Sequence, residues 1–178
     1  MDVRDAADLI APTVVAGEHW ADLGAGRGTF TVALAGLLGP KGTVYAIERD
    51  DAAIAALQAL ARRSGDDRAA IVVRQGDFTR PIDLPALDGV LLANALHFVD
   101  RSRQAEVLAR LGGGVEQEGK VLVIEYDNRP PSRWVPFPVS LARLGDVARS
   151  AGLRAPVLIG RRRSDFGGTM YAACMTRS

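Results

Sequence analysis

Three short segments of this sequence combine residue types suited to binding a nucleotide, and each comes directly after an apolar run. The first is Asp22-Leu23-Gly24-Ala25-Gly26-Arg27-Gly28. Its glycines permit a tight turn with positive φ and let the backbone approach a ligand, and a helix beginning after the turn favours negative charge. By itself, a glycine cluster of this kind is also compatible with a plain tight turn.

Acidic residues follow the next two apolar runs. Glu48, with Arg49 beside it, lies 20 residues after Gly28 (48 − 28 = 20), close to the spacing of about 20 at which nucleotide-binding folds place an acid on the ribose hydroxyls. Asp77 could accept a hydrogen bond from an adenine amino group, and Phe78 could line the base. Taken singly, Glu48 could equally be a solvated acid and Asp77 a turn residue beside a core aromatic. Together the three segments indicate a ligand site at the carboxyl edge of a parallel sheet.

The elements that position these residues follow from the apolar pattern. Short apolar runs predict strands over 20–23, 43–47, 70–74, 89–93 and 121–125. Helical spacing predicts helices over 2–15, 30–38, 51–64 (capped by Asp50) and 101–111 (ended by Gly112-Gly113-Gly114), and a further one from Leu141 to Ala148 closed by Gly152. This alternation implies βαβ units and a parallel sheet. Runs over 155–159 and 169–175 predict a final hairpin antiparallel to the sheet.

Composition limits the remaining classes of protein. The chain has 178 residues, a formal net charge of +1 and 48% hydrophobic residues, which excludes a disordered chain and predicts one domain over 1–178. No apolar run reaches the roughly 18 residues of a membrane span and the acidic start is not a signal peptide, so we expect a cytoplasmic protein. The near-zero charge argues against a nucleic-acid-binding protein. The single cysteine, Cys174, and two histidines argue against a metal site.

The glycine spacing distinguishes between nucleotide cofactors. A dinucleotide fingerprint has the pattern G-x-G-x-x-G, whereas here the pattern is G-x-G-x-G and Thr29 occupies the position of the last glycine. With Asp22 before the turn, the sequence resembles the S-adenosylmethionine-dependent methyltransferases of the seven-stranded, Rossmann-like class, in particular the small-molecule branch that includes the ubiquinone/menaquinone methyltransferases. The resemblance implies a three-layer α/β sandwich whose mostly parallel sheet of seven strands ends in an antiparallel hairpin, with S-adenosylmethionine as cofactor and S-adenosylhomocysteine as product.

The resemblance also assigns roles to individual residues. It implies that Asp22, Gly24, Ala25 and Gly26 hold the methionine part of the cofactor and that Gly28 supports the turn. It assigns the ribose to Glu48, with Arg49 adjacent, the adenine to Asp77 and Phe78, and the neighbourhood of the methionyl group to Asn94.

Methyl transfer from a sulfonium depends mainly on alignment of the nucleophile, which can supply roughly 7–11 kcal/mol. A general base is optional, and the candidates are His97 and Tyr126, with Glu125 and Asp127 nearby. His97 has an alternative role as a histidine that fastens the turn after the fourth strand. The reaction expected is methyl transfer to a small-molecule acceptor.

The segment 128–138 holds four prolines and cannot form a regular helix or central strand. We expect it to lie over the active site, with Arg129, Trp134 and Phe137 facing a flat or anionic acceptor. The alternative is that Trp134 and Phe137 only pack the loop onto the sheet. Because this segment is shorter than the helical lid of larger relatives, a larger acceptor, a partner protein or a homodimer could close the site.

Two other features have simpler expected roles. Arg161-Arg162-Arg163 is expected to be a solvated hairpin end, with a contact to an anion or to RNA as the alternative. Cys174 is expected to be a small core residue of the last strand.

Two other functions stay open. One is a protein that binds S-adenosylmethionine without turnover or acts with a partner. The other, an NAD-dependent oxidoreductase, is opposed by the glycine spacing and by the lack of a Tyr-x-x-x-Lys pair.

Overall fold

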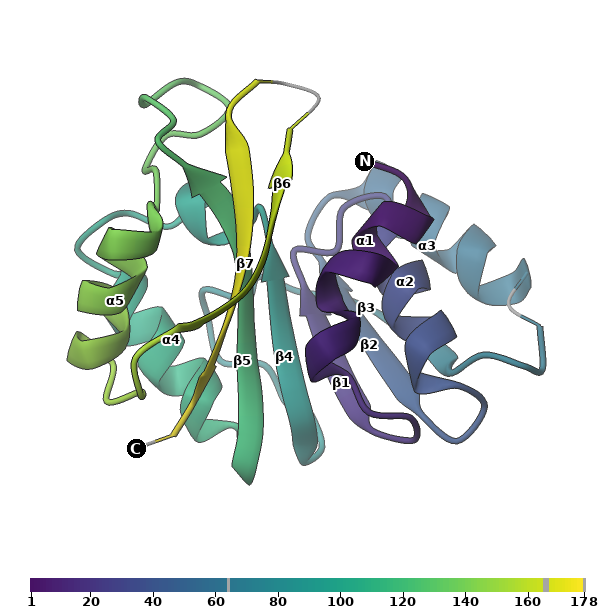
Figure 1. Ribbon diagram of the computed structural model, residues 1–178. Coiled ribbons are helices and arrows are strands. Elements are labelled where there is room, and N and C mark those ends of the chain that lie inside the picture. The colour runs from purple at the N-terminus through teal and green to yellow at the C-terminus, as the bar shows by residue number, and fades with distance from the viewer. Residues whose placement is uncertain (64, 165–166, 178) are drawn as a thin grey trace.

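The computed structural model describes residues 1–63, 65–164 and 167–177. They form one seven-stranded sheet in the order β3-β2-β1-β4-β5-β7-β6, shown in Figure 1. The strands are β1 (His19–Leu23), β2 (Thr43–Glu48), β3 (Ala70–Gln75), β4 (Leu87–Ala93), β5 (Val115–Asp127), β6 (Val157–Arg163) and β7 (Thr169–Thr176). The first five run parallel, and β7 is antiparallel to both β5 and β6. The predicted seven-stranded mixed sheet with a C-terminal hairpin is confirmed.

Helices cover both faces of the sheet (Figure 1). They are α1 (Val3–Ile10), α2 (Thr29–Leu38), α3 (Asp51–Arg63), α4 (Gln104–Gly113) and α5 (Leu141–Ser150), with 3₁₀ turns η1 (Ala11–Thr13) and η2 (Leu96–Phe98). On one face, α1 and α2 bury side chains such as Leu9 and Leu34; on the other, α4 and α5 bury Val107 and Leu144. Within the described residues no helix is long and apolar enough to cross a membrane.

The parallel strands all end at the upper edge in Figure 1, and the predicted site residues follow the ends of these strands. Gly24 follows β1, Glu48 ends β2, Asp77 follows β3 and Asn94 follows β4. The antiparallel pairing Asp127↔Thr169 brings the start of β7 to the same edge. A single edge therefore collects residues from segments far apart in the sequence.

The boundaries of two predicted helices are wrong. The opening helix ends at Ile10 rather than about 15 and passes into the 3₁₀ turn η1, where Pro12 stands in the first positions and cannot donate to a continuing α-helix. The helix expected over 101–111 begins only at Gln104, because Asp100 forms a turn with Ser102, and it extends through Gly113. At Gly112 a Cβ would lie 2.7 Å from Leu153 Cδ2, so this glycine lets α4 pack closely on Leu153.

The end of the chain also differs from expectation. β5 is longer than 121–125, and β6 extends through the three arginines 161–163 at the hairpin end, of which Arg161 and Arg163 are exposed. Arg161 Nη1 donates to Asp127 Oδ2 at 2.6 Å and Arg162 pairs with Asp5. Cys174 lies in β7, partly buried.

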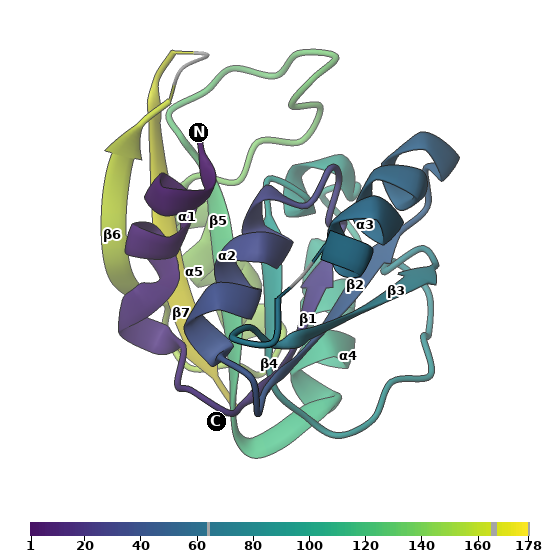
Figure 2. The same cartoon turned by 90° about the vertical axis from the view of Figure 1, so that its right-hand side faces the viewer.

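The proline-rich segment contains neither a helix nor a named strand within 128–138. It forms a long loop beyond the carboxyl end of β5, beside the upper part of β7 (Figure 2). Val135 of this loop is buried, and Phe137 N donates to His97 O at 3.0 Å. The loop is thus attached to the turn that follows β4.

Candidate functional site

A cavity of about 490 Å³ lies along the carboxyl edge of the sheet, within the range typical of small-molecule sites. Its lining side chains divide into two groups by their strands. One group lies on the side of β1, β2 and β3: the glycine loop, Glu48, Arg49, Asp77 and Phe78. The other lies on the side of β5, β7 and β6: Tyr126, Met170, Arg163 and Ser164. Asn94 and Ala95 lie between the two groups. Eight of the ten predicted cofactor residues line this one space: Gly24, Ala25, Gly26, Glu48, Arg49, Asp77, Phe78 and Asn94.

The glycine loop between β1 and α2 adopts the positive φ values that the sequence predicts, 74° at Gly24, 54° at Gly26 and 92° at Gly28. A Cβ on Gly24 would lie 3.0 Å from Ala95 Cβ, so this glycine permits close packing. A Cβ on Gly26 would meet nothing within 4 Å, so its backbone borders open space. Gly28 turns away from the cavity, since a Cβ there would meet Leu57 and Leu60 of α3.

Glu48 is held by the backbone around it. Its Oε2 accepts a hydrogen bond from Gly26 N at 2.8 Å, and its Oε1 accepts from Arg49 N at 2.7 Å and Asp50 N at 3.1 Å. The carboxylate thereby links the end of β2 to the glycine loop, and the three backbone donors hold it in place at the cavity wall.

Asp22 does not line the cavity, although the sequence resemblance implies a cofactor contact. It is 1% exposed, and its Oδ2 accepts from Thr31 Oγ1 in the first turn of α2 at 2.6 Å. Burial raises the pKa of Asp22 to about 6. The hydrogen bond from Thr31 lowers this pKa, and the negative charge of Glu48 raises it slightly further. Its position indicates that it orients the start of α2 and the loop before it.

Asp77 and Phe78 form a supported turn after β3. Asp77 Oδ1 accepts from Thr79 N and Thr79 Oγ1. Burial opposes ionisation, but these bonds and the charges of Arg49 and Arg80 outweigh it, so the pKa of Asp77 lies below its usual value. Phe78 O accepts from Arg110 Nη2 at 2.6 Å. Asp77 is therefore an anion at neutral pH, beside an aromatic ring.

Asn94 has two unusual features. Its φ is 53°, a left-handed conformation uncommon outside glycine. Its side-chain Oδ1 is buried and has no hydrogen-bond partner among the described residues. Strain and an unpaired buried acceptor both cost free energy and are found preferentially at ligand sites.

His97 lies behind the cavity wall rather than in it. Its side chain is 3% exposed, with Nδ1 2.7 Å from Glu125 Oε2, and its backbone N donates to Glu125 Oε1 at 3.0 Å. Because His97 O also accepts from Phe137 N, this residue connects η2, β5 and the proline-rich loop. The geometry favours the fastening role over that of a general base.

Of the two candidate bases, Tyr126 alone lines the cavity. The guanidinium of Arg129 lies 4.5 Å from its ring centroid. None of the described lining residues comes from 128–138: Trp134 is 66% exposed and lies beneath the Arg133 guanidinium. The structure therefore does not bring Arg129, Trp134 and Phe137 together as a wall of this cavity.

Several lining residues were missed by the sequence prediction, including Met1, Phe30, Thr79, Arg163 and Met170. Thr79 had a local signal, because a Thr two residues after an Asp commonly closes a turn. Arg163 belongs to the arginine run for which an anion contact was the alternative interpretation. Met170 had no signal, since only the β5–β7–β6 pairing brings it to this edge.

Comparisons with known proteins agree with this geometry. A family model described as a methyltransferase domain matches residues 21–119. Among solved structures, the CcbJ methyltransferase from Streptomyces caelestis superposes with a TM-score of 0.77 at 18% identity, over 99% of this chain and 95% of that one. A SAM-dependent methyltransferase from Aquifex aeolicus superposes with a TM-score of 0.74 at 18% sequence identity, over 96% of this chain and 89% of that one. Mitomycin 7-O-methyltransferase MmcR gives 0.72 at 21% over 98% of this chain, which spans only 53% of that one.

These structural likenesses show the fold, which confirms the Rossmann-like sandwich. No curated protein matches the chain in sequence, and no comparison singles out the ubiquinone/menaquinone branch, which stays a prediction. The family model covers 99 of the 178 residues (119 − 21 + 1 = 99), including the glycine loop, Glu48, Asp77 and Asn94. The chain belongs to the methyltransferase-domain family.

Proposed function

We propose that this protein transfers a methyl group from S-adenosylmethionine to a small-molecule acceptor. The observation that carries the proposal is the convergence of an open glycine loop, the fixed Glu48 carboxylate and the unpartnered Asn94 Oδ1 on one cavity. Several of the structural neighbours were solved with this cofactor or its product bound, among them the glycopeptide N-methyltransferase MtfA and CalO1 of calicheamicin biosynthesis.

The residues present fit such a cofactor. A nucleoside needs a hydrogen-bond acceptor for its ribose hydroxyls, and Glu48 at the end of β2 supplies it. Its base needs a hydrogen-bond acceptor and an apolar surface, and Asp77 and Phe78 after β3 supply these. The amino group of the cofactor needs a hydrogen-bond acceptor, and Asn94 Oδ1 has no hydrogen-bond partner among the described residues. The bare backbone at Gly26 leaves room for close approach.

S-adenosylmethionine supplies a methyl group on a sulfonium, ready for displacement by a nucleophile. The chain's own contribution is orientation: Glu48 and the glycine loop fix one side of the cavity, and Tyr126 with Met170 borders the other. Preorganised positioning of this kind accounts for a large share of the barrier reduction in two-substrate reactions. Tyr126 is the residue we propose to contact the acceptor.

The test is calorimetric titration of the purified protein with S-adenosylhomocysteine, S-adenosylmethionine and NAD in parallel. We expect micromolar binding of the first two and none of NAD. Binding of NAD alone would replace the proposal with an oxidoreductase, and binding of none would overturn it. Cofactor binding without methyl transfer to any acceptor would support the noncatalytic alternative.

A further inference from the structure

One side of the cavity differs in charge from the other. On the side of β1–β3 the charged lining side chains are of both signs: Arg27, Glu48, Arg49 and Asp77. On the side of β5, β7 and β6, the only charged side chain among the described lining residues is Arg163. An acceptor that enters beside Tyr126 and Met170 therefore meets a cation and no lining carboxylate.

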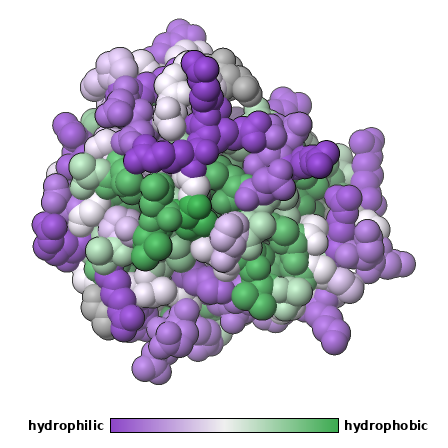
Figure 3. Space-filling model, in the orientation of Figure 1, coloured by the Kyte–Doolittle hydropathy of each residue, from purple (hydrophilic) through white to green (hydrophobic). Residues whose placement is uncertain are grey.

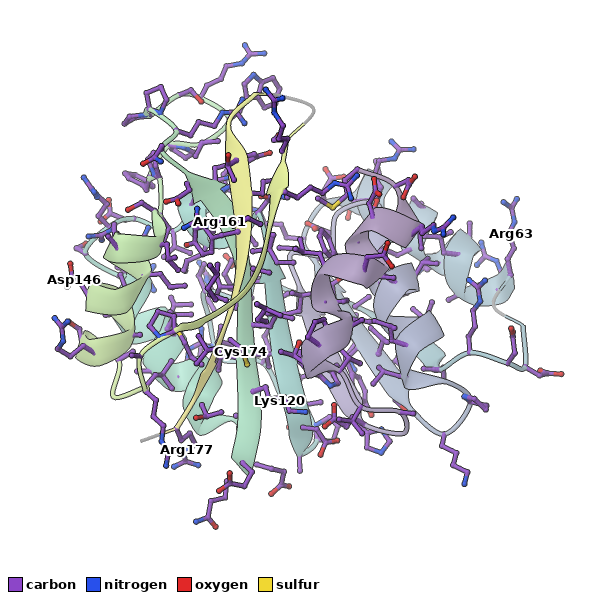
Figure 4. The ribbon with its side chains drawn as sticks, viewed as in Figure 1. Arg63, Lys120, Asp146, Arg161, Cys174 and Arg177 are labelled. Atoms are coloured by element: carbon purple, nitrogen blue, oxygen red, sulfur yellow. The ribbon has the colours of Figure 1, made fainter. Side chains whose placement is uncertain are left out.

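The three consecutive arginines of β6 differ in their ion-pair partners. Arg161 pairs with Asp127, and Arg162 pairs with Asp5. Arg163 is exposed and its side chain makes no ion pair within 1–63, 65–164 and 167–177. Figure 4 shows Arg161 directed toward the end of β5, and Figure 3 shows hydrophilic side chains over the upper part of this face.

Among the described residues, two acids of β5 at this side already have partners. Glu125 is fully buried against His97, and Asp127 accepts from both Arg161 and Leu141 N. Neither carboxylate forms an ion pair with Arg163, whose guanidinium is therefore free to pair with a ligand as far as the described residues show. A guanidinium of this kind matches the two oxygens of a carboxylate in a bidentate arrangement.

Apart from Ser164, the other lining side chains at this end are apolar or aromatic: Phe30, Tyr126, Met170 and Met1. Such surfaces favour a flat, apolar body. Resting on the proposed function, we propose that the methyl acceptor is a small aromatic carboxylate, with Arg163 as the residue that selects its acid group. The carboxylate of this acceptor would lie at β6, and its aromatic ring would lie beside Tyr126.

The experiment uses matched neutral and acidic probes. Protein saturated with S-adenosylhomocysteine is titrated by saturation-transfer NMR with 2-, 3- and 4-hydroxybenzoate and with the corresponding hydroxybenzamides, which have the same shape and no charge. We expect at least one acid to bind about tenfold or more tightly than its amide, as the loss of a charge-assisted pair implies. Arg163→Gln should reduce that acid to the affinity of its amide and leave the affinity for S-adenosylhomocysteine unchanged.

The control is Arg63→Gln, which removes the same charge at the end of α3. Arg63 lies at the outer edge of the molecule in Figure 4 and does not line the cavity, so this variant should retain the preference for the acid. Absence of binding by all three acids, equal binding of the amides, or a preference that survives Arg163→Gln would overturn the inference and leave the proposed function intact. Weaker S-adenosylhomocysteine binding in Arg163→Gln would also overturn it, since Arg163 would then belong to the cofactor site. No S-adenosylhomocysteine binding by the parent protein would overturn both proposals.

Discussion

Glu48 combines a structural and a binding role in one carboxylate. Its oxygens accept from three backbone N–H groups and border the cavity. We expect Glu48→Ala to weaken S-adenosylhomocysteine binding by about 1.5–3 kcal/mol, the contribution of hydrogen bonds to a charged group. Calorimetry would measure it, with Asp8→Ala on the exposed face of α1 as control. An unchanged affinity would contradict the ribose assignment.

Asp22 makes the stability of the protein depend on pH in an unusual direction. Its pKa is about 6 in the folded protein against 3.8 for an ordinary Asp. A raised pKa means that the folded state binds the proton more tightly, so stability falls as pH rises from about 3.8 to about 6. Below this window both states are protonated and the penalty is absent; above it the penalty is complete.

Asp22→Asn should remove this penalty, because the amide carries no charge and its oxygen can still accept from Thr31. We expect the variant to gain stability relative to the parent as pH rises, by roughly 2–3 kcal/mol at pH 7. Urea unfolding between pH 4 and pH 7.5 would measure the difference, with exposed Asp8→Asn as control. A difference that is constant with pH would show that Asp22 is not the titrating group.

At the scale of elements, the contact between β5 and η2 determines the shape of the cavity. Glu125 holds both the backbone N and the ring Nδ1 of His97, and the cavity residues Asn94, Ala95, Phe98 and Val99 surround that turn. A glutamine in its place has one oxygen and an NH₂ group instead of two oxygens, so one of the two acceptor atoms that face His97 is lost.

Glu125→Gln is therefore expected to destabilise the fold by about 1–3 kcal/mol, because a buried donor loses its partner. It should also weaken S-adenosylhomocysteine binding, since η2 is released. Glu116→Gln, an exposed position of the same strand, should change neither quantity. Equal midpoints of urea unfolding for the two variants would refute the fastening role of His97 and Glu125.

The elements themselves were largely predictable because their signals are local. Apolar runs mark β1 to β5, and Asp50 caps α3 as expected, its Oδ1 accepting from Ala53 N at 2.8 Å. What the sequence could not provide depends on distant partners: α4 continues through Gly112 because of Leu153, and Arg161 and Arg162 lie in a strand opposite Asp127 and Asp5. The unusual φ of Asn94 also had no sequence signal.

Over the whole molecule, the two edges of the sheet have different properties. The carboxyl edge holds the positive φ values of Gly24, Gly26 and Asn94 and the cavity. At the opposite end of β1, Trp20 is fully buried, and its Nε1 donates to Glu18, which also pairs with Lys120 at 2.6 Å. Well-packed contacts there can support a strained binding edge.

Gly89→Ala tests this division of roles. A Cβ at Gly89 would lie 2.6 Å from the ring of Trp20, which is fully buried, so we expect a loss of about 1–3 kcal/mol from overpacking. Gly36→Ala makes the same change at an exposed site of α2 with nothing within 4 Å of the new Cβ, and should stabilise by about 0.5–1 kcal/mol. Denaturant unfolding would measure both, and calorimetry should find S-adenosylhomocysteine affinity unchanged in each folded variant. A loss of affinity in Gly89→Ala that matches its loss of stability would show that the two edges are coupled.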